Sequence, residues 1–148
     1  MLKANFISAK EAASRVKDGS TICPVAMTLV SASESILKEL ETSFVKTGHP
    51  SGLTLLHSCG QSDRKDGIQH LAHEGMVKRI IGSHWGLQPR WMEMIANSKV
   101  EAYCLPQGQI AQLYRSMACG LPGKMSKVGL GTFIDPRVEG GKMNERTK

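Results

Sequence analysis

Short apolar runs recur along the chain and are separated by stretches in which apolar residues follow a helical spacing. The runs do not alternate strictly between apolar and polar residues, which is typical of strands buried on both faces of a sheet. Pro24 predicts an early end or an edge position for the first of them. A weaker run at 128–133 predicts one more strand. The runs that predict the main strands are 21–25, 53–57, 77–82 and 100–105.

Helical segments are predicted between these runs. Ser8 and Glu11 have the spacing of a capping box, in which a hydroxyl and a carboxylate pair with free amides of the first turn. Gly19 ends that helix. The basic stretch 1–17 is therefore interpreted as part of the fold and not as a targeting segment. A second helix begins at Glu34 and carries apolar residues at positions 36, 37, 40 and 44.

Three further helical segments follow. A short one is predicted at 68–73, and Pro89 is suited to open the next, because proline has no amide to leave unpaired. The inner face of that helix is predicted to consist of Met92, Ile95 and Ala96. The last helix, which Gly120 closes, has the clearest amphipathic pattern in the chain. Its apolar positions are Ile110, Ala111, Leu113, Tyr114, Met117 and Ala118.

The alternation of strands and helices predicts an α/β fold, with a mostly parallel sheet flanked by helices. The 148 residues are enough for one domain with a buried core. The polar stretch 135–148 contains no predicted element. We therefore expect a single domain, 1–148, that is cut short or is completed by another polypeptide. Ligands of such sheets bind beyond the carboxyl ends of the strands, here in the loops after Val25, His57, Gly82 and Leu105.

Composition argues against several kinds of partner. The formal charge is +6, but the basic residues are scattered and aromatic residues make up only 5%, which argues against a nucleic-acid binder. No apolar run approaches the length of a membrane span. The four cysteines form no C-x-x-C motif, which predicts reduced, mostly buried thiols in a cytoplasmic protein. The mild positive charge suits a small anionic ligand.

The turn from Leu105 to Gly108 is the first candidate site. It lies between a predicted strand and the strongest predicted helix, where helix-start amides favour an anionic ligand. Gln107 offers a donor and an acceptor and can bind a carboxylate or a thioester oxygen without carrying charge. The alternative is that Pro106, Gln107 and Gly108 only turn the chain and that Gln107 caps the helix.

Histidines provide two weaker candidates. His84 stands beside a tryptophan between two glycines, so it could act as a general base or wall a ligand site, or it could simply be packed and hydrogen-bonded. His70 and His73 share a helix face and follow His57 and Cys59, but this spacing matches no zinc site, so ordinary surface histidines and no metal are expected. The glycines at 129 and 131 lack the rest of a dinucleotide fingerprint and are attributed to backbone packing.

Several motifs occur in an order that is known from one enzyme family. They are His70 to Arg79 (HLAHEGMVKR), Gly82 to Gly86 (GSHWG), Leu105 to Gly108 (LPQG), Gly129 to Arg137 (GLGTFIDPR) and Glu139 to Glu145 (EGGKMNE). From about Phe6 to its end, the chain resembles the N-terminal half of the class I acyl-CoA transferases, in particular the single-chain acetate/propionate/acetoacetate type.

The resemblance implies a fold related to ribose-5-phosphate isomerase-like domains and transfer of CoA from an acyl-CoA to a short-chain carboxylic or keto acid. In the family, a glutamate attacks the thioester and a glutamyl-CoA intermediate forms. CoA is a substrate, and no covalently bound cofactor is implied. The nucleophile and most of the CoA site belong to the C-terminal half, so no catalytic residue is expected in this chain. The partners are acyl-CoA, the acid, and the missing half or a homo-oligomer.

The resemblance also assigns the site residues. It implies that Gln107 faces the reacting carboxylate, within the Pro106–Gly108 turn. The loops that contain Ser58, Gly60 and His84 are expected to line the same mouth. The family has a glycine-rich loop after the first strand, whereas residues 24–30 here contain no glycine.

Residues 1–148 alone are therefore expected to lack CoA-transfer activity and to expose an apolar face that promotes self-association. The alternative is a non-catalytic α/β domain that binds small anionic metabolites near Gln107.

Overall fold

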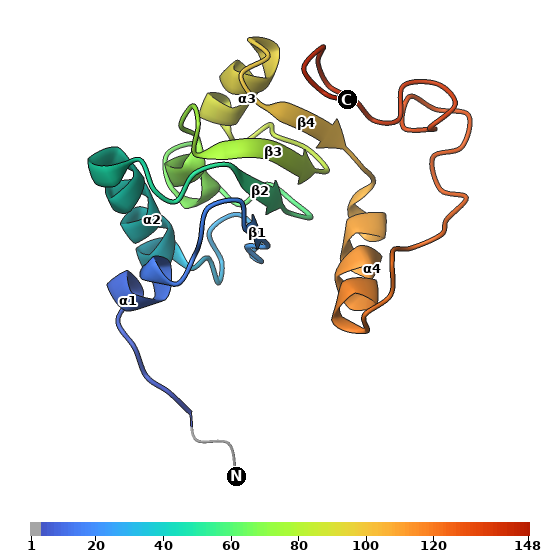
Figure 1. Ribbon diagram of the computed structural model, residues 1–148. Coiled ribbons are helices and arrows are strands. Elements are labelled where there is room, and N and C mark those ends of the chain that lie inside the picture. The colour runs from blue at the N-terminus through green and yellow to red at the C-terminus, as the bar shows by residue number, and fades with distance from the viewer. Residues whose placement is uncertain (1–3) are drawn as a thin grey trace.

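The computed structural model describes residues 4–148 and contains a four-stranded parallel sheet with the strand order β1-β2-β3-β4 (Figure 1). Strands and helices alternate along the chain. Each strand from β2 onward pairs with the strand that precedes it in the sequence. The predicted α/β class with a parallel sheet is confirmed. The strands are β1 (Thr21–Ile22), β2 (Leu53–Leu56), β3 (Val77–Gly82) and β4 (Glu101–Cys104). The helices are α1 (Ala9–Ser14), α2 (Glu34–Thr47), the 3₁₀ helix η1 (Gly67–Leu71), α3 (Pro89–Ala96) and α4 (Gln107–Ala118).

Local signals in the sequence account for the helix ends. Ser8 Oγ accepts a hydrogen bond from the Glu11 amide at 3.1 Å, as the capping box predicts, whereas the Glu11 carboxylate pairs with Arg15 at 3.0 Å. Gly48 ends α2 with a φ of +76°, a conformation that glycine adopts without steric cost. Residues 1–3 of the basic N-terminal stretch lie outside the described residues.

The core lies between the sheet and the helices that cover it. Leu55 of β2, Ile80 of β3 and Ala102 of β4 are fully buried. Trp91 of α3 is also fully buried, and its Nε1 donates to the Ile68 carbonyl at 2.9 Å. The predicted inner face of α3 is therefore partly wrong: Trp91 and Ile95 face the core, while Met92 is 52% exposed.

Two predicted strands need correction. The run 21–25 forms only the two-residue edge strand β1, because Pro24 has no amide to pair with the sheet. The run 128–133 is a series of turns and not a strand. Gly129 has a φ of +91°, and a Cβ there would lie 2.2 Å from Ile134 Cδ1. Close packing thus accounts for this glycine, as the sequence indicated.

Helix α4 lies beyond the carboxyl ends of the strands and not over a face of the sheet (Figure 1). Tyr114 Oη donates to the Leu56 carbonyl at 3.2 Å, and burial raises the pKa of this phenol to about 12. Of the apolar face predicted for α4, only Ile110 is fully buried, and Met117 is 46% exposed. The amphipathic pattern is present, but half of its apolar positions, namely Ala111, Met117 and Ala118, are exposed among the described residues.

The polar stretch after Asp135 contains no helix or strand, but it packs along β4 (Figure 1). Thr147 Oγ1 accepts a hydrogen bond from the Ala102 amide at 2.9 Å. The Asn144 side chain donates to the Val100 carbonyl at 3.0 Å. This stretch therefore covers the outer edge of β4, which the polar sequence did not reveal.

The thiols are less buried than predicted. The cysteines are free, but Cys23 and Cys119 are exposed, and Cys59 and Cys104 are half-buried. Three of them stand at the carboxyl ends of β1, β2 and β4, where the sheet opens toward solvent. No helix within residues 4–148 combines the length and the apolar character needed to cross a membrane.

Candidate functional site

A cavity of about 320 Å³ lies at the carboxyl ends of β3 and β4. It brings together three of the site residues predicted from the sequence, namely His84, Pro106 and Gln107. The parallel direction of the strands explains this, because the loops that follow them meet at one edge of the sheet. The lining residues are Ser83, His84, Cys104, Leu105, Pro106, Gln107, Phe133 and Ile134.

Gln107 is exposed and forms the first residue of α4. The N-cap of the helix is Pro106, so Gln107 does not hold the cap position that the alternative interpretation gave it. Gln107 lines the cavity beside the free amides of the first helical turn, which favour a negatively charged group. Gly108 follows in the helix, is exposed, and is not among the lining residues.

Gly60 holds His84 at the cavity. The Gly60 amide donates to His84 Nε2 at 3.3 Å, which places the proton of a neutral ring on Nδ1. A Cβ on Gly60 would lie 2.7 Å from His84 Cε1, so only glycine permits this approach. The Gln88 side chain, oriented so that both of its polar atoms are paired, donates to the His84 carbonyl at 3.2 Å. Gly60 thus positions the imidazole, and Gln88 holds the backbone of the same residue.

Ser58 reaches the cavity through a neighbour. Its carbonyl accepts a hydrogen bond from Ser83 Oγ at 2.6 Å, and Ser83 lines the cavity. Cys104 Sγ donates to the Ser83 carbonyl at 3.2 Å, and burial raises the pKa of this thiol. Cys104 therefore provides a neutral wall and not a thiolate nucleophile. Ser58 and Gly60 contact residues of the cavity wall, Ser83 and His84, but do not line the cavity themselves.

A buried polar layer beneath these loops was not singled out from the sequence. His57 is fully buried directly after β2, and burial lowers its pKa to about 4, so the ring is neutral. Its Nδ1 donates to the Cys59 carbonyl at 2.8 Å, while its Nε2 has no partner among the described residues. Gln61 Nε2 donates to the Pro24 carbonyl at 2.6 Å. Only the position of His57 at the end of an apolar run could have signalled this layer.

The loop after β1 is built without glycine, as the sequence showed. Thr28 and Ser31 nevertheless adopt positive φ values of 52° and 64°, a region that costs energy for residues with a side chain. Met27 and Val30 pair across this turn and are more than 60% exposed. Cys59 Sγ donates to a carbonyl of the loop, that of Ala26, at 2.9 Å. The loop thus presents apolar side chains near the site.

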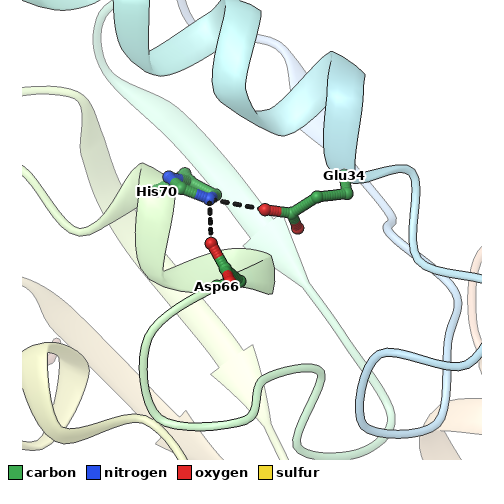
Figure 2. A group of neighbouring side chains, drawn as sticks. All are labelled: Glu34, Asp66 and His70. Atoms are coloured by element: carbon green, nitrogen blue, oxygen red, sulfur yellow. Dashed lines mark hydrogen bonds and ion pairs between the residues drawn. The ribbon is translucent and has the colours of Figure 1, made fainter.

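Figure 2 shows the group of residues that best fits a metal site, Glu34, Asp66 and His70. His70 Nε2 lies 2.7 Å from a Glu34 oxygen, and Nδ1 lies 2.5 Å from a Glu41 oxygen. Burial opposes the charge on His70, but the Glu41 and Glu34 carboxylates outweigh it and raise its pKa. Both ring nitrogens are therefore engaged as donors, which leaves none for a metal.

The same network corrects the expectation of surface histidines. The His70 side chain is only 11% exposed, and His73 Nε2 lies 2.7 Å from a Glu41 oxygen. Both histidines connect the η1 region to α2. The arrangement is a set of ion pairs that fixes the loop after β2 to its neighbouring helix.

Comparison with known proteins identifies a family. Residues 6–147 match the family model described as coenzyme A transferase. The chain is 42% identical over 145 residues to caffeate CoA-transferase of Acetobacterium woodii, which covers 97% of this chain and 28% of that protein. It is 39% identical over 144 residues to acetate CoA-transferase YdiF of Escherichia coli K12, which covers 96% of this chain and 27% of that protein.

Solved structures agree with these relatives. The crystal structure of the YdiF apoenzyme from E. coli O157:H7 superposes with a TM-score of 0.91 at 37% identity, over 96% of this chain and 28% of that one. Glutaconate coenzyme A-transferase of Acidaminococcus fermentans, at 19% identity, shares the fold with a TM-score of 0.65, over 85% of this chain and 39% of that one. The chain thus spans little more than a quarter of the length of the YdiF-type proteins that it matches.

Proposed function

Because the chain belongs to the coenzyme A transferase family and corresponds to the N-terminal portion of its longer members, we propose that it forms one wall of an acyl-CoA:carboxylate CoA-transferase site. The observation that carries the proposal is the exposed Gln107 amide at the 320 Å³ cavity, next to the start of α4. CoA would be a substrate there, together with a short-chain carboxylic or keto acid. Two of its relatives are named for caffeate and for acetate, so the family accepts acids of different size.

The proposed chemistry is covalent catalysis by a carboxylate outside this chain. A glutamate oxygen adds to the thioester carbonyl, the C–S bond of the resulting tetrahedral adduct breaks, and CoA leaves as a thiolate, so that an acyl-glutamyl anhydride remains. The thiolate then attacks the glutamyl carbonyl and releases the first acid. The second acid attacks this glutamyl thioester, and the same steps in reverse give the new acyl-CoA. No external oxidant or reductant is needed.

Gln107 would act on the oxygen that gains negative charge in these steps. Its Nε2–H can donate to that oxygen, and because a carboxamide does not ionise, it cannot take a proton from the attacking carboxylate. His84, held by Gly60, would form the opposite wall of the same cavity. Ser58 would support that wall through Ser83. In this arrangement Pro106 and Gly108 position Gln107 and need not touch the substrate.

The exposed apolar residues indicate that another polypeptide docks on this chain. They lie in the loop after β1, at the end of α4 and in the segment that follows it, and one of them, Phe133, lines the proposed site. A soluble surface seldom leaves so many large apolar side chains together, so we infer that the remainder of a CoA-transferase, or a second copy of the chain, covers them in a cytoplasmic enzyme. They are Val25, Met27, Val30, Met117, Leu121, Met125, Leu130 and Phe133.

Two assays test the proposal. The 148-residue chain, incubated alone with acetyl-CoA and acetoacetate, should show no turnover and no glutamyl thioester. Mixed with the portion of YdiF that lies beyond the matched region, it should gain activity. In that mixture Gln107→Ala should lower kcat/KM by about 100-fold, the cost of losing one donor to a developing oxyanion. The exposed Gln112 on the same helix provides the control, Gln112→Ala, which should change it little.

The outcomes that contradict the proposal are specific. Turnover by the chain alone would mean that it carries its own nucleophile. Equal activity of Gln107→Ala and Gln112→Ala would remove Gln107 from the reaction. Calorimetric binding of a sugar phosphate in preference to CoA would instead favour the non-catalytic binder of small anions.

A further inference from the structure

Helix α4 carries Gln107 at its first position, yet it has little contact with the sheet. It stands beyond the carboxyl ends of the strands (Figure 1), and more than half of its residues are exposed. Within residues 4–148, one hydrogen bond joins α4 to a strand, and it runs from Tyr114 Oη to the Leu56 carbonyl at 3.2 Å. The orientation of α4 therefore depends on this bond and on the packing of the buried Ile110.

The Leu56 carbonyl needs this donor because of a proline in the neighbouring strand run. The Thr54 amide donates to the Ser20 carbonyl at 2.9 Å, and in a parallel pair such bonds recur at every second residue. Continued by this rule, the ladder would bring the nitrogen of Pro24 opposite the Leu56 carbonyl, but proline has no N–H to donate. Tyr114 Oη supplies the missing donor from α4.

The Tyr114 hydroxyl is a permanent donor. The side chain is half-buried, and burial is the main reason that the pKa of the phenol is raised to about 12. The hydroxyl therefore keeps its proton throughout the neutral range. Leu56 is only 3% exposed, so water is a poor substitute for this donor, and a buried carbonyl without a partner is costly.

Tyr114 and Gln107 lie on the same face of α4. They are seven residues apart, which at 3.6 residues per turn leaves them about 20° apart around the helix axis. Ile110 stands between them on this face and is buried. A rotation of α4 about its axis therefore turns Gln107 and Tyr114 together, and it cannot redirect Gln107 without moving Tyr114 Oη away from the Leu56 carbonyl.

We propose that Tyr114 is a positioning residue of the reaction, whose hydrogen bond to the Leu56 carbonyl fixes the rotation of α4 and thereby directs Gln107 toward the oxygen that gains negative charge. This role rests on the proposed function, because it takes Gln107 to donate to that oxygen. Tyr114 does not touch the substrate and acts through Gln107. Its effect on the rate should therefore disappear where the Gln107 side chain is absent.

Tyr114→Phe tests this role, because it removes the hydroxyl and keeps the ring. In the mixture with the portion of YdiF beyond the matched region, it should lower kcat about tenfold, which is the order of one net hydrogen bond, with KM nearly unchanged. That split is expected when the lost interaction is made only in the transition state. The matched control is Tyr103→Phe, which removes the contact of the other tyrosine with the Lys148 carbonyl and should behave like the wild type.

A double-mutant cycle separates positioning from a general loss of stability. In a Gln107→Ala background, Tyr114→Phe should change kcat by no more than about twofold, because the group that Tyr114 positions is already gone. A tyrosine that only stabilises the fold would lower kcat by the same factor in both backgrounds.

A second measurement needs no activity. Residual dipolar couplings of backbone N–H groups in the ¹⁵N-labelled 148-residue chain report the orientation of α4 relative to the sheet. Tyr114→Phe should change the couplings of Gln107–Ala118 and leave those of β2 and β3 as in the wild type. Tyr103→Phe should change neither set.

Three results would overturn the role of Tyr114. They are a wild-type kcat of Tyr114→Phe in an enzyme that Gln107→Ala impairs, a loss that persists in full in the Gln107→Ala background, and unchanged couplings of α4. Failure of the proposed function gives a different result, namely a mixture without turnover or equal activity of Gln107→Ala and Gln112→Ala. Altered couplings of α4 would then still show that Tyr114 orients the helix, but without a consequence for this reaction.

Discussion

Replacing His57 with glutamine should remove much of the sensitivity of this protein to mild acid. His57 is fully buried after β2 and is neutral, with its Nδ1–H bonded to the Cys59 carbonyl. Burial is the main reason that its pKa falls from 6.5 to about 4, and the nearby His84 adds to the effect. In the unfolded chain His57 therefore binds a proton near pH 6.5, whereas in the folded chain it binds one only near pH 4.

The magnitude follows from this difference in pKa. At about 1.4 kcal/mol for each tenfold change in proton affinity, a fall from 6.5 to about 4 amounts to about 3 kcal/mol of unfolding free energy. This stability is present above pH 6.5 and is lost as the pH falls toward 4, because the unfolded state binds more protons over that window. Set against a typical total of roughly 5–15 kcal/mol, the loss is large.

Other titrating groups do not hide the loss of stability that His57 causes between pH 6.5 and 4.5. Burial works against ionisation of Glu34 and Glu41, but their hydrogen bonds to His70 and His73 lower their pKa values below 4.5, so their contribution is lost only at lower pH. The pKa of His70 is raised above 6.5, so its contribution is fully present below pH 6.5 and is lost as the pH rises through the raised value. Between pH 6.5 and 4.5, His57 is therefore the main source of acid sensitivity among these groups.

Urea unfolding at pH 6.5, 5.5 and 4.5 measures the effect, because the contribution of His70 is already present at pH 6.5. The wild type should lose most of the 3 kcal/mol across this series, whereas His57→Gln, although less stable at pH 6.5, should show a much flatter dependence. His49→Gln, at an exposed histidine, provides the control and should follow the wild type. Parallel pH dependence of the wild type and His57→Gln would refute the assignment of a buried neutral imidazole.

Three further substitutions test close contacts. Gly60→Ala should displace His84, whose ring atom would lie 2.7 Å from the new Cβ, and should lower CoA-transfer activity of the complemented enzyme several-fold. Gly82→Ala should destabilise the fold by about 1–3 kcal/mol, because the new Cβ would lie 2.5 Å from a buried imidazole. Thr147→Val should cost about 1–3 kcal/mol in urea unfolding, because it leaves the buried Ala102 amide without its acceptor.

Matched controls accompany these variants. Gly86→Ala adds a methyl group where no atom lies within 4 Å, so it should leave both activity and stability unchanged. Thr42→Val, at an exposed position of α2, should shift the unfolding midpoint little. If Gly60→Ala behaves like Gly86→Ala, the close approach of Gly60 to His84 does not matter for the reaction. Equal effects of Thr147→Val and Thr42→Val would show that the contact of Thr147 with β4 does not persist in solution.

The main strands could be predicted from the sequence because burial on both faces leaves a recognisable pattern. Leu53, Leu55 and Leu56 are all buried, and no polar residue needs to alternate with them. The run 128–133 has similar composition, but its glycines adopt positive φ values that a strand does not contain. Composition alone does not distinguish a strand from a chain of turns whose apolar side chains line a cavity. The phase of the short helix α3 was ambiguous for a related reason, because Trp91 and Met92 are adjacent apolar residues and only one can face the core.

The candidate site was predictable where it depends on topology and unpredictable where it depends on pairs distant in sequence. Gln107 and His84 follow parallel strands, and this places them at one edge of the sheet. The contact of Gly60 with His84 joins residues 24 positions apart, and nothing in the local sequence of either indicates it.

The exposed apolar side of α4 ties these observations together. A helix usually shows an apolar stripe because that stripe is buried, but in α4 Met117, which belongs to the apolar stripe, remains 46% exposed. Packing within residues 4–148 accounts for Ile110 and Tyr114, but it leaves Met117 without a partner that buries it. The chain spans about 28% of the length of the relatives it matches, so we infer that the stripe is matched to a surface beyond it. Gln107, at the first turn of the same helix, would then lie where that surface meets the cavity.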